Sequence, residues 1–463
     1  MTPDAQPSPG PPRIGMISLG CAKNLIDAEI MLGAAKAEGF AITSDPADAD
    51  LLIVNTCGFI DSAKQESIDA ILEANRQRSA GKRPDAKLVV SGCLSQRFST
   101  ELVHELPEVD AFIGLDQVAE AGAIFRRVLA NEQPGVLNLV TPKSRYIPDF
   151  ATPRYRLTPL HTTYVKIAEG CNHPCSFCVI PQMRGRHRSR TLDSVVREVR
   201  RHVAEGVKEI NLISQDTTYY GMDSWEQKAG PRQPVDPARG TTLIQLLDAI
   251  AQIDGDFWVR LLYTHPAHWS DALIAAIARN PRVVRYVDMP LQHIHPDMLQ
   301  AMRRETSRAH IEHLIARLRA GIPDIGLRTT FIVGFPGETE EHFESLLAFI
   351  EATRFERLGV FNYSQEDGSR AAKLDGQILT RVKNRRFRKA MALQQKIACE
   401  IAAAQIGRTL RVLVEQPQVA RTAHDAPEVD CRVLLTRPAE VGHFLEVKVL
   451  STQTYDLVAE PLG

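Results

Sequence analysis

The sequence has almost no net charge, no long apolar run and few cysteines for its length. With 55 Lys and Arg against 56 Asp and Glu, the net charge is −1, so no overall field draws the chain to nucleic acid. No apolar run reaches the roughly 18 residues that a membrane span requires. The first twelve residues, MTPDAQPSPGPP, have neither a basic nor an apolar stretch, so residues 1–12 are expected to be a disordered tail rather than a signal peptide.

The eight cysteines are too few for a disulfide scaffold in a chain of 463 residues, and six of them fall into two groups of three. Grouped thiols indicate ligands in a reducing compartment, so a cytoplasmic location is expected. The chain is long enough for about three domains, and its composition is that of a soluble globular protein.

The most informative group is Cys171, Cys175 and Cys178, in the segment CNHPCSFC. This C-x3-C-x2-C spacing lets three thiolates bind three irons of one [4Fe–4S] cube and leaves the fourth iron open. Radical chemistry from S-adenosylmethionine needs such an open iron. A structural zinc site with His173 or His187 as fourth ligand is the alternative, but zinc usually takes two C-x2-C units, and no second unit lies nearby.

The second group, Cys21, Cys57 and Cys93, is spaced at equal intervals of 36 residues. A short apolar run precedes each cysteine, as in a strand buried on both faces, and helical patterns lie between the runs at 26–38 and 62–77. The alternation predicts a parallel sheet in which all three cysteines follow the carboxyl ends of strands. Open α/β sheets bind ligands at that edge.

Two interpretations of this second triad remain open, three ordinary buried cysteines or a second cluster. Because the three positions match in a chain that already has one cluster motif, they favour a second [4Fe–4S] cluster with an open iron. Gly20, Gly58 and Gly92 flank the cysteines and would allow tight turns or the close approach of a bulky group.

From about 155 to 375 the chain alternates between strand-like and helix-like segments. Six strands are expected, at 163–168, 209–214, 258–263, 284–289, 327–334 and 357–363, with helices such as 192–205 and 339–353 between them. Six β/α repeats predict a partial barrel of the TIM type, with its chemistry at the carboxyl ends of the strands. The polar residues at those ends are therefore site candidates: Gln215, Asp216, Thr264, His265, Gln292 and His293.

Two motifs in this region offer further ligand-binding groups. Gly334 and Gly337 belong to the turn GFPGET, whose backbone N–H groups could cradle a polar ligand, unless the turn is a plain β–α connection. The run RGRHRSR, residues 184–190, follows the cysteine loop. Its arginines could neutralise a carboxylate or phosphate, or form a solvated basic loop.

After a helix expected at about 379–404, the pattern changes to period two in the runs 410–414, 431–435 and 444–449. Turn residues separate these runs, which predicts a small closed β-barrel. Between residues 408 and 463 there are six Arg or Lys and eight Asp or Glu, whereas an RNA-binding module is normally basic. We therefore expect a basic protein partner, with Asp425, Glu428 and Asp430 among the contact charges.

Together these features resemble the methylthiotransferases, a radical S-adenosylmethionine family with two iron–sulfur clusters. The resemblance runs from about Arg13 to Pro461, through GCAKN, NTCGFI, SGCLSQR, CNHPCSFCVIP, RGRHRSR, IVGFPGE and a terminal module similar to a TRAM domain. Within the family, VDMPLQH (287–293), ISQDTTYYG (213–221) and DAPEVD (425–430) are similar to the RimO branch, which modifies an aspartate of ribosomal protein S-twelve.

The resemblance implies an α/β fold in three parts: an N-terminal parallel-sheet domain at 13–140 with an auxiliary cluster, a radical partial (β/α)6 barrel at 155–395, and a TRAM-like β-barrel at 396–463. It implies that Cys171, Cys175 and Cys178 hold the cluster that cleaves S-adenosylmethionine to a 5′-deoxyadenosyl radical, which abstracts hydrogen from the β-carbon of the aspartate. The cluster on Cys21, Cys57 and Cys93 would deliver sulfur, and a second S-adenosylmethionine would supply the methyl group.

Candidate contacts to S-adenosylmethionine are Gln215, Gly334, Gly337 and Arg188. The expected partners are ribosomal protein S-twelve or the small subunit, an electron donor such as flavodoxin or ferredoxin, and a sulfur source, with the enzyme a monomer away from membranes. Two alternatives stay open, a MiaB-like enzyme acting on isopentenyl-adenosine of tRNA and a non-catalytic iron–sulfur carrier. Removal of the residues after about 405 is expected to abolish modification of the ribosomal protein while S-adenosylmethionine cleavage persists.

Overall fold

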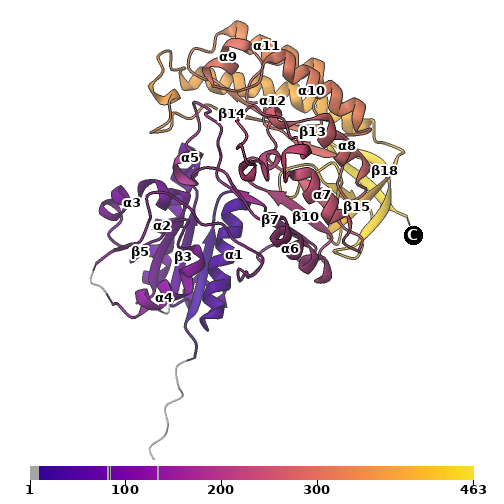
Figure 1. Ribbon diagram of the computed structural model, residues 1–463. Coiled ribbons are helices and arrows are strands. Elements are labelled where there is room, and N and C mark those ends of the chain that lie inside the picture. Colours follow the sequence, from indigo (N-terminus) through magenta and orange to yellow (C-terminus); the bar gives the residue numbers. More distant parts are fainter. Residues whose placement is uncertain (1–9, 81–82, 84, 133–134, 463) are drawn as a thin grey trace, which may run out of the picture. The chain divides into compact units, whose positions relative to one another are not determined.

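The structure, a computed structural model, describes residues 10–80, 83, 85–132 and 135–462, and the chain divides into two compact units (Figure 1). The first unit contains the residues up to Leu157 together with Gln182–Gly185, and the second contains Thr158–Pro181 and the residues from Arg186 onward. The tail expectation for residues 1–9 lies outside the described residues. Within the described part, no helix is long and apolar enough to cross a membrane.

The first unit is built on a parallel sheet of order β2-β1-β3-β4-β5-β6, as predicted. Its strands are β1 (Arg13–Ser18), β2 (Ala41–Thr43), β3 (Leu51–Thr56), β4 (Lys87–Gly92), β5 (Ala111–Phe112) and β6 (Leu137–Asn138). Its helices are α1 (Ala22–Ala37), α2 (Asp61–Ala80), α3 (Cys93–Glu105) and α4 (Ala121–Leu129). Every residue of β3 is buried, because the sheet is covered on both faces.

The second unit contains the predicted partial barrel, with all six expected strands in sequence order. Sheets β11-β10-β7 and β12-β13-β14 are joined by a parallel bridge between Val259 and Val283. The strands are β7 (Thr162–Lys166), β10 (Glu209–Ile213), β11 (Trp258–Leu261), β12 (Tyr286–Asp288), β13 (Gly326–Val333) and β14 (Arg357–Asn362). The short strands β8 (Ala168–Glu169) and β9 (Arg188–Ser189) pair separately.

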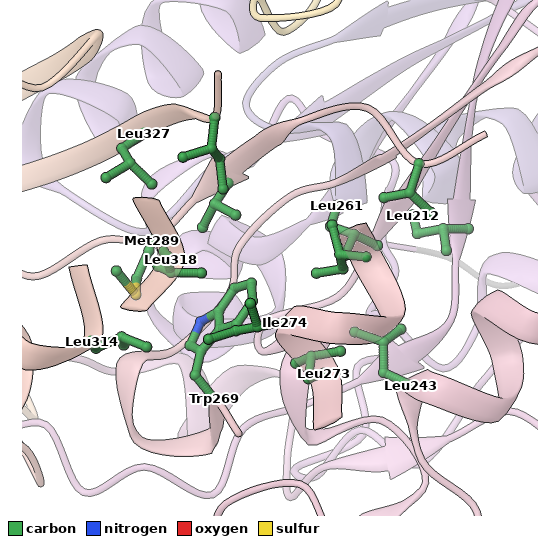
Figure 2. Close-up of a cluster of buried hydrophobic side chains, with 14 of the residues drawn as sticks. Leu212, Leu243, Leu261, Trp269, Leu273, Ile274, Met289, Leu314, Leu318 and Leu327 are labelled. Carbon is green, nitrogen blue, oxygen red and sulfur yellow. The ribbon is translucent and has the colours of Figure 1, made fainter. Parts of the chain in front are cut away.

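Helices cover the outside of this partial barrel. They are α6 (Leu192–Ala204), α7 (Leu243–Ala251), α8 (Asp271–Arg279), α9 (Pro296–Ala301), α10 (Arg308–Gly321), α11 (Glu340–Thr353) and α12 (Thr380–Ala403), and the short α5 (Ile180–Met183) lies in the cysteine loop region. Figure 2 shows the core between the two layers, where Leu212 of β10 and Leu261 of β11 approach side chains of α7 and α8. The outward faces of the strands are thus apolar, which leaves the inward faces for polar groups.

A closed barrel of order β15-β16-β17-β19-β18 ends the chain. Its strands are β15 (Thr409–Gln416), β16 (Val419–Thr422), β17 (Val433–Leu435), β18 (Phe444–Gln453) and β19 (Asp456–Pro461). The closed barrel that the sequence predicts is confirmed, although only three of its strands were expected. The strand β16 was missed because it has only four residues, VART, and the strand β19, DLVAEP, because its apolar residues are consecutive rather than alternating.

Buried ion pairs join this closed barrel to the inside of the partial barrel. Glu209 of β10 accepts from Arg260 of β11 at 2.8 Å and also from Arg421 of β16. Arg260 donates in addition to the carbonyl of Ala423 at 2.9 Å. Burial would raise the pKa of Glu209, but the two guanidinium groups outweigh it and lower the pKa. The closed barrel therefore supplies one of the two cations that keep Glu209 ionised.

Two carboxylates of the acidic loop 425–430 lie in the same interior, which corrects the expectation that they contact a partner, whereas Glu428 is exposed. Asp425 forms an ion pair with Arg357 of β14, and Asp430 lies 3.3 Å from Arg328 of β13 and accepts from the Tyr286 hydroxyl at 2.7 Å. Both carboxylates are buried, so the prediction that they are contact charges for a partner was wrong. A sequence cannot reveal this, because the partners come from distant strands.

Candidate active site

The first cysteine triad lies at the carboxyl ends of three neighbouring strands, β1, β3 and β4. Cys21 precedes the first residue of α1, Cys57 follows β3 directly, and Cys93 is the first residue of α3. Because β1 pairs with β3 and β3 with β4, the three cysteines share one edge of the sheet. The structure thus brings together the three residues that the spacing selected.

Hydrogen bonds and close packing hold these loops together. The Asn24 side chain donates to the carbonyl of Leu19 at 2.6 Å and to that of Thr56 at 3.1 Å, which ties the loop after β1 to the end of β3. Gly20 has a φ of +91°, and a Cβ there would lie 2.9 Å from the Cβ of Cys57. A glycine is needed at this point because two cysteine loops touch.

The thiols of this triad influence one another electrostatically. Burial raises the pKa of Cys57 to about 12, and the charges of Cys93 and Cys21 add to the increase. Burial also raises the pKa of Cys93, and the charge of Cys21 contributes. Burial opposes ionisation of Cys21 as well, but the charges of Lys23 and Arg184 outweigh it and lower the pKa of that thiol. The three neighbouring sulfurs fit a cationic group that binds all of them, which is the donor set of an iron–sulfur cluster.

One arginine of the run 184–190 belongs to this site. The Nη2 of Arg184 lies 3.4 Å from the Sγ of Cys93 and donates to Asp27 at 2.9 Å. The Arg184 side chain is 2% exposed. The sequence indicated that an arginine of this run has a role without saying which, and the structure singles out Arg184 for the first triad.

The second triad, Cys171, Cys175 and Cys178, lies in the loop that follows β8. The Ser176 backbone N–H donates to the carbonyl of Met302 at 3.0 Å and its hydroxyl donates to that of Ala301 at 2.8 Å, which fixes the loop against the end of α9. The three cysteines are half-buried. The loop is therefore held by the partial barrel rather than extended into solvent.

Two thiols of the second triad, those of Cys171 and Cys178, have a raised pKa. Burial raises the pKa of Cys178 to about 12, with a contribution from Cys175, and it raises that of Cys171 well above its ordinary value. The Nη1 of Arg304 lies 3.3 Å from the Sγ of Cys175. As at the first triad, three mutually repelling thiols with one nearby guanidinium suit an iron–sulfur cluster.

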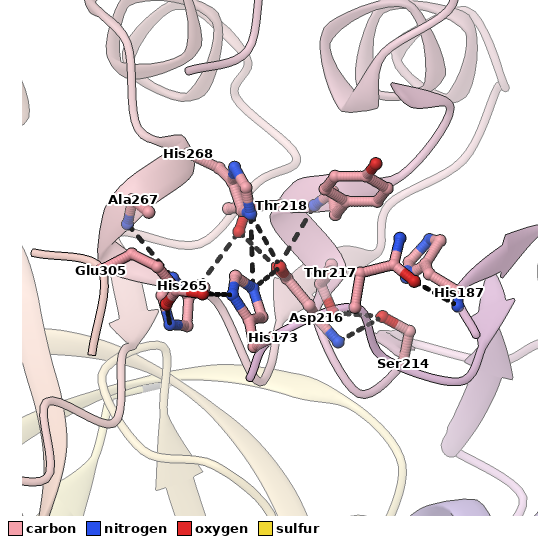
Figure 3. A network of polar contacts seen from close by, with 12 residues as sticks. His173, His187, Ser214, Asp216, Thr217, Thr218, His265, Ala267, His268 and Glu305 are labelled. Carbon is pink, nitrogen blue, oxygen red and sulfur yellow. Dashed lines mark hydrogen bonds and ion pairs between the residues drawn. The ribbon is translucent and has the colours of Figure 1, made fainter. Parts of the chain in front are cut away.

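A network of buried polar side chains lies beneath this loop (Figure 3). The Nε2 of His173 lies 2.7 Å from Asp216, and its Nδ1 lies 3.2 Å from Glu305. Burial alone would lower the pKa of His173, but the two carboxylates outweigh it and raise the pKa to about 10. His268 reaches the same Asp216 carboxylate at 3.1 Å, and His265 stacks on His173 with ring centroids 3.6 Å apart. Since both nitrogens of His173 face carboxylates, the side chain is not placed as a fourth metal ligand.

Gln215 and Arg188 both lie beside Glu169, just before the cysteine loop. The Gln215 amide donates to Glu169 at 3.4 Å, and its buried Oε1 has no hydrogen-bond partner. Arg188 of β9 is paired across the strands with Glu169 of β8. An orphaned buried acceptor is costly unless a ligand satisfies it, so Gln215 offers a contact point.

Gly334 and Gly337 lie elsewhere, after β13, and their N–H groups bond within the protein. The Gly334 N–H donates to Glu338 at 2.5 Å, and the Gly337 N–H donates to the Gly376 carbonyl at 3.0 Å. Glu338 also accepts from Arg386 at 2.6 Å and lies 3.2 Å from His293. A Cβ at Gly334 would lie 2.3 Å from Cγ of Lys383, whereas nothing lies within 4 Å of one at Gly337, so the turn has open space only at Gly337.

The remaining strand-end candidates have structural partners. Thr264 donates to the Asp288 carbonyl at 2.7 Å, while Gln292 has a φ of +73° and its N–H bonds the Thr330 carbonyl at 2.8 Å. The sequence gave no signal for Arg304 or Glu305, because each is far from the cysteines along the chain. Only the folded strands bring them to the loop.

Three family models match separate stretches of the chain. Residues 13–114 match the uncharacterized protein family UPF0004, residues 165–350 the radical SAM superfamily and residues 406–462 the TRAM domain. A protein of Opitutus terrae named ribosomal protein uS12 methylthiotransferase RimO is 58% identical, with 97% of each chain covered. One of the same name from Akkermansia muciniphila is 52% identical, covering 97% of this chain and 100% of its own length.

Solved structures share the fold at low identity. The radical S-adenosylmethionine methyltransferase TsrM from Kitasatospora setae has a TM-score of 0.53 and 16% identity, covering 75% of this chain and 72% of its own. The cobalamin-dependent radical enzyme OxsB has a TM-score of 0.51 and 10% identity, covering 83% of this chain and 56% of its own. At these identities the likeness concerns the fold alone.

Proposed function

The chain belongs to the RimO family of ribosomal protein uS12 methylthiotransferases, and we propose that it adds a methylthio group to the β-carbon of an aspartate of uS12, the small-subunit protein S-twelve. It is a radical S-adenosylmethionine enzyme. The observation that carries the proposal is the presence of two cysteine triads, one at the carboxyl ends of parallel strands in the first unit and one in the loop after β8 in the second. An unactivated C–H bond lies beyond acid–base side chains, so two metal centres suit the reaction.

Cys171, Cys175 and Cys178 would hold the radical cluster. When bound, this cluster supplies the electron that cleaves S-adenosylmethionine reductively. Gln215 would accept a hydrogen bond from the cofactor through its orphaned Oε1, and Arg188, on the strand paired with Glu169, would contribute charge. The N–H groups of Gly334 and Gly337 are already bonded, so Gly337 would leave room for the cofactor rather than donate to it, and Gly334 would let the Lys383 side chain pack against the turn.

Cys21, Cys57 and Cys93 would hold the auxiliary cluster, at which sulfur is delivered. The functional division would be residues 13–140 for sulfur delivery, 155–395 for radical formation and 396–463 for closing the barrel interior. We further propose that the enzyme acts as a cytoplasmic monomer and receives electrons from flavodoxin or ferredoxin and sulfur from an external source. Size-exclusion chromatography and reduction assays with each donor test these points.

Iron content tests the two clusters. After anaerobic reconstitution we expect about eight irons per chain, and about half of that when Cys171, Cys175 and Cys178 are replaced by Ala, since each cube holds four. Zinc in place of iron, or loss of all iron from that folded variant, would contradict the proposal. A Cys57→Ala variant should still cleave S-adenosylmethionine but form no methylthiolated product.

Mass spectrometry tests the substrate. Ribosomal protein uS12 and tRNA would be compared between cells with and without the gene. A mass gain of one methylthio group on uS12 supports the proposal, as do the names of relatives 58% and 52% identical. A methylthio-adenosine in tRNA as the product would support the MiaB-like alternative instead.

A further inference from the structure

Each cysteine triad has one buried guanidinium group against one of its sulfurs. Arg184 approaches Cys93 at 3.4 Å in the first unit, and Arg304 approaches Cys175 at 3.3 Å in the second. Arg184 is 2% exposed and Arg304 is 9% exposed. Both are therefore shielded from solvent, and a buried charge acts more strongly and with less screening than a charge at the surface.

Both guanidinium groups are fixed in place by oxygen acceptors. Arg184 is held by Asp27 of α1, the helix that begins directly after Cys21. Arg304 is held by the Pro290 carbonyl at 3.0 Å, in the segment after β12. Neither side chain can turn away from its sulfur without breaking a buried hydrogen bond, which is costly.

A positive charge and an N–H donor at a ligand sulfur act on the charge of the group that the sulfur binds. Reduction adds one electron to an iron–sulfur cluster and makes it more negative. Hydrogen bonds to the sulfurs and nearby charge are known means by which proteins set cluster potentials. A buried arginine at one ligand sulfur therefore stabilises the reduced form and raises the reduction potential.

We propose that Arg184 and Arg304 are positioning residues that set the reduction potentials of the auxiliary and the radical cluster separately, each through the one sulfur that it contacts. The inference rests on the proposed function, because it needs a cluster at each triad. The electron comes from the external reductant, and no bond forms or breaks in this step. Two independent arginines would let one donor supply two clusters of different potential.

The test isolates one cluster at a time in the full chain. The auxiliary cluster is studied with Cys171, Cys175 and Cys178 replaced by Ala, and the radical cluster with the other triad replaced. Reduction with dithionite is followed by electron paramagnetic resonance against potential. In the chain that lacks Cys171, Cys175 and Cys178, Arg184→Gln should lower the equilibrium constant for reduction of the auxiliary cluster about tenfold. This corresponds to a reduction potential lower by about 59 mV for one electron. In the chain that lacks Cys21, Cys57 and Cys93, Arg304→Gln should lower the reduction potential of the radical cluster by a similar amount.

The chain offers matched controls for both substitutions. Arg186 belongs to the same run as Arg184 and is exposed, and Arg303 is the exposed neighbour of Arg304. Arg186→Gln and Arg303→Gln should leave the potentials unchanged. Arg184→Lys keeps the charge, so the reduction potential of its auxiliary cluster should lie between those of the parent and of Arg184→Gln. If Arg184→Gln binds no iron, the potential of Arg184→Lys is compared with the parent instead.

The outcomes separate this inference from the proposed function. Absence of iron from the parent backgrounds would contradict the two clusters themselves. Full iron content with Arg184 and Arg304 variants at the same potentials as their controls would overturn the role of the arginines while leaving the clusters in place. A shift of both clusters by either single variant would overturn the separate setting of the potentials.

Discussion

Glu209 shows how single buried charges stabilise the second unit. Its carboxylate is fully buried between Arg260 and Arg421, so a neutral side chain there leaves Arg260 without this carboxylate and Arg421 with Glu415 alone. We expect Glu209→Gln to lower the free energy of unfolding by about 3–5 kcal/mol, the usual cost of breaking a buried pair. Denaturant unfolding of the purified chain measures this.

A surface pair provides the control for Glu209. Lys389 and Glu344 are both about half exposed and only 2.5 Å apart. Because solvent screens such a pair, Glu344→Gln should cost no more than about 1 kcal/mol. A double variant, Glu209→Leu with Arg260→Met, should be less destabilised than Glu209→Gln alone. If Glu209→Gln and Glu344→Gln lowered the free energy of unfolding equally, the importance of burial would be contradicted.

His187 predicts a dependence of stability on pH. Burial lowers the pKa of its imidazole to about 4, although Asp223 and Asp216 act in the opposite direction. In the unfolded chain a histidine takes up a proton near pH 6.5. Between about pH 6.5 and 4 the unfolded state therefore binds more protons, so the free energy of unfolding falls as the pH falls.

The size of this effect follows from the pKa difference. Between about pH 6.5 and 4, protonation linked to His187 should lower the free energy of unfolding by about 2–3 kcal/mol. A His187→Gln variant of the iron-free chain should show a flatter decline over this window in denaturant unfolding at a series of pH values. His443→Gln, at an exposed histidine, should leave the slope as in the parent. An unchanged slope in His187→Gln would refute the assignment.

At the scale of elements, the turn between β4 and α3 positions a cluster ligand. Gly92 has a φ of +95°, and a Cβ there would lie 2.3 Å from the Thr56 carbonyl oxygen. We expect Gly92→Ala to displace Cys93 and to remove about half of the iron, that of the auxiliary cluster, in a reconstituted chain. Gly39→Ala is the control, because Gly39 has a φ of +85° but its nearest atom is 3.8 Å away. Loss of iron from both variants would mean that strain alone is responsible.

The elements were predictable where a pattern is local, and the contacts were not. The strand β3 follows from a short apolar run, and the helix α6 follows from the helical spacing of its apolar residues. The shared edge of Cys21, Cys57 and Cys93 follows from the parallel topology. Arg304 could not be connected to Cys175 in this way, because its loop reaches the cysteines only after several strands have packed. The burial of Asp425 and Asp430 was missed for the same reason, whereas Glu428 is exposed as expected of a contact charge.

At the scale of the whole molecule, the closed barrel stabilises the partial barrel from within. Arg421, Asp425 and Asp430 pair with charges on β10, β13 and β14. Removal of these three side chains would leave Arg328 and Arg357 without those carboxylates and Glu209 with one cation fewer. The residues after 405 are therefore part of the stable core of the second unit as well as a separate small barrel.

A chain that ends at residue 405 should consequently lose more than substrate modification. We expect its second unit to unfold at lower denaturant concentration than that of the full chain, and its S-adenosylmethionine cleavage after reconstitution to fall together with iron content. This differs from the sequence expectation that cleavage persists. The reason is that buried unpaired charges cost several kcal/mol each.

A compensated truncation separates the structural role of the closed barrel from a role in substrate binding. The same truncation with Glu209→Leu, Arg260→Met and Arg357→Leu replaces charges that lose a partner by apolar groups, which is often neutral or stabilising for buried pairs. Arg328 is kept, because it still pairs with Asp288 at 2.9 Å. If the compensated chain regains stability and S-adenosylmethionine cleavage but not uS12 modification, the barrel has both roles. If the simple truncation already folds and cleaves at the rate of the full chain, the buried charges are not what holds the partial barrel together.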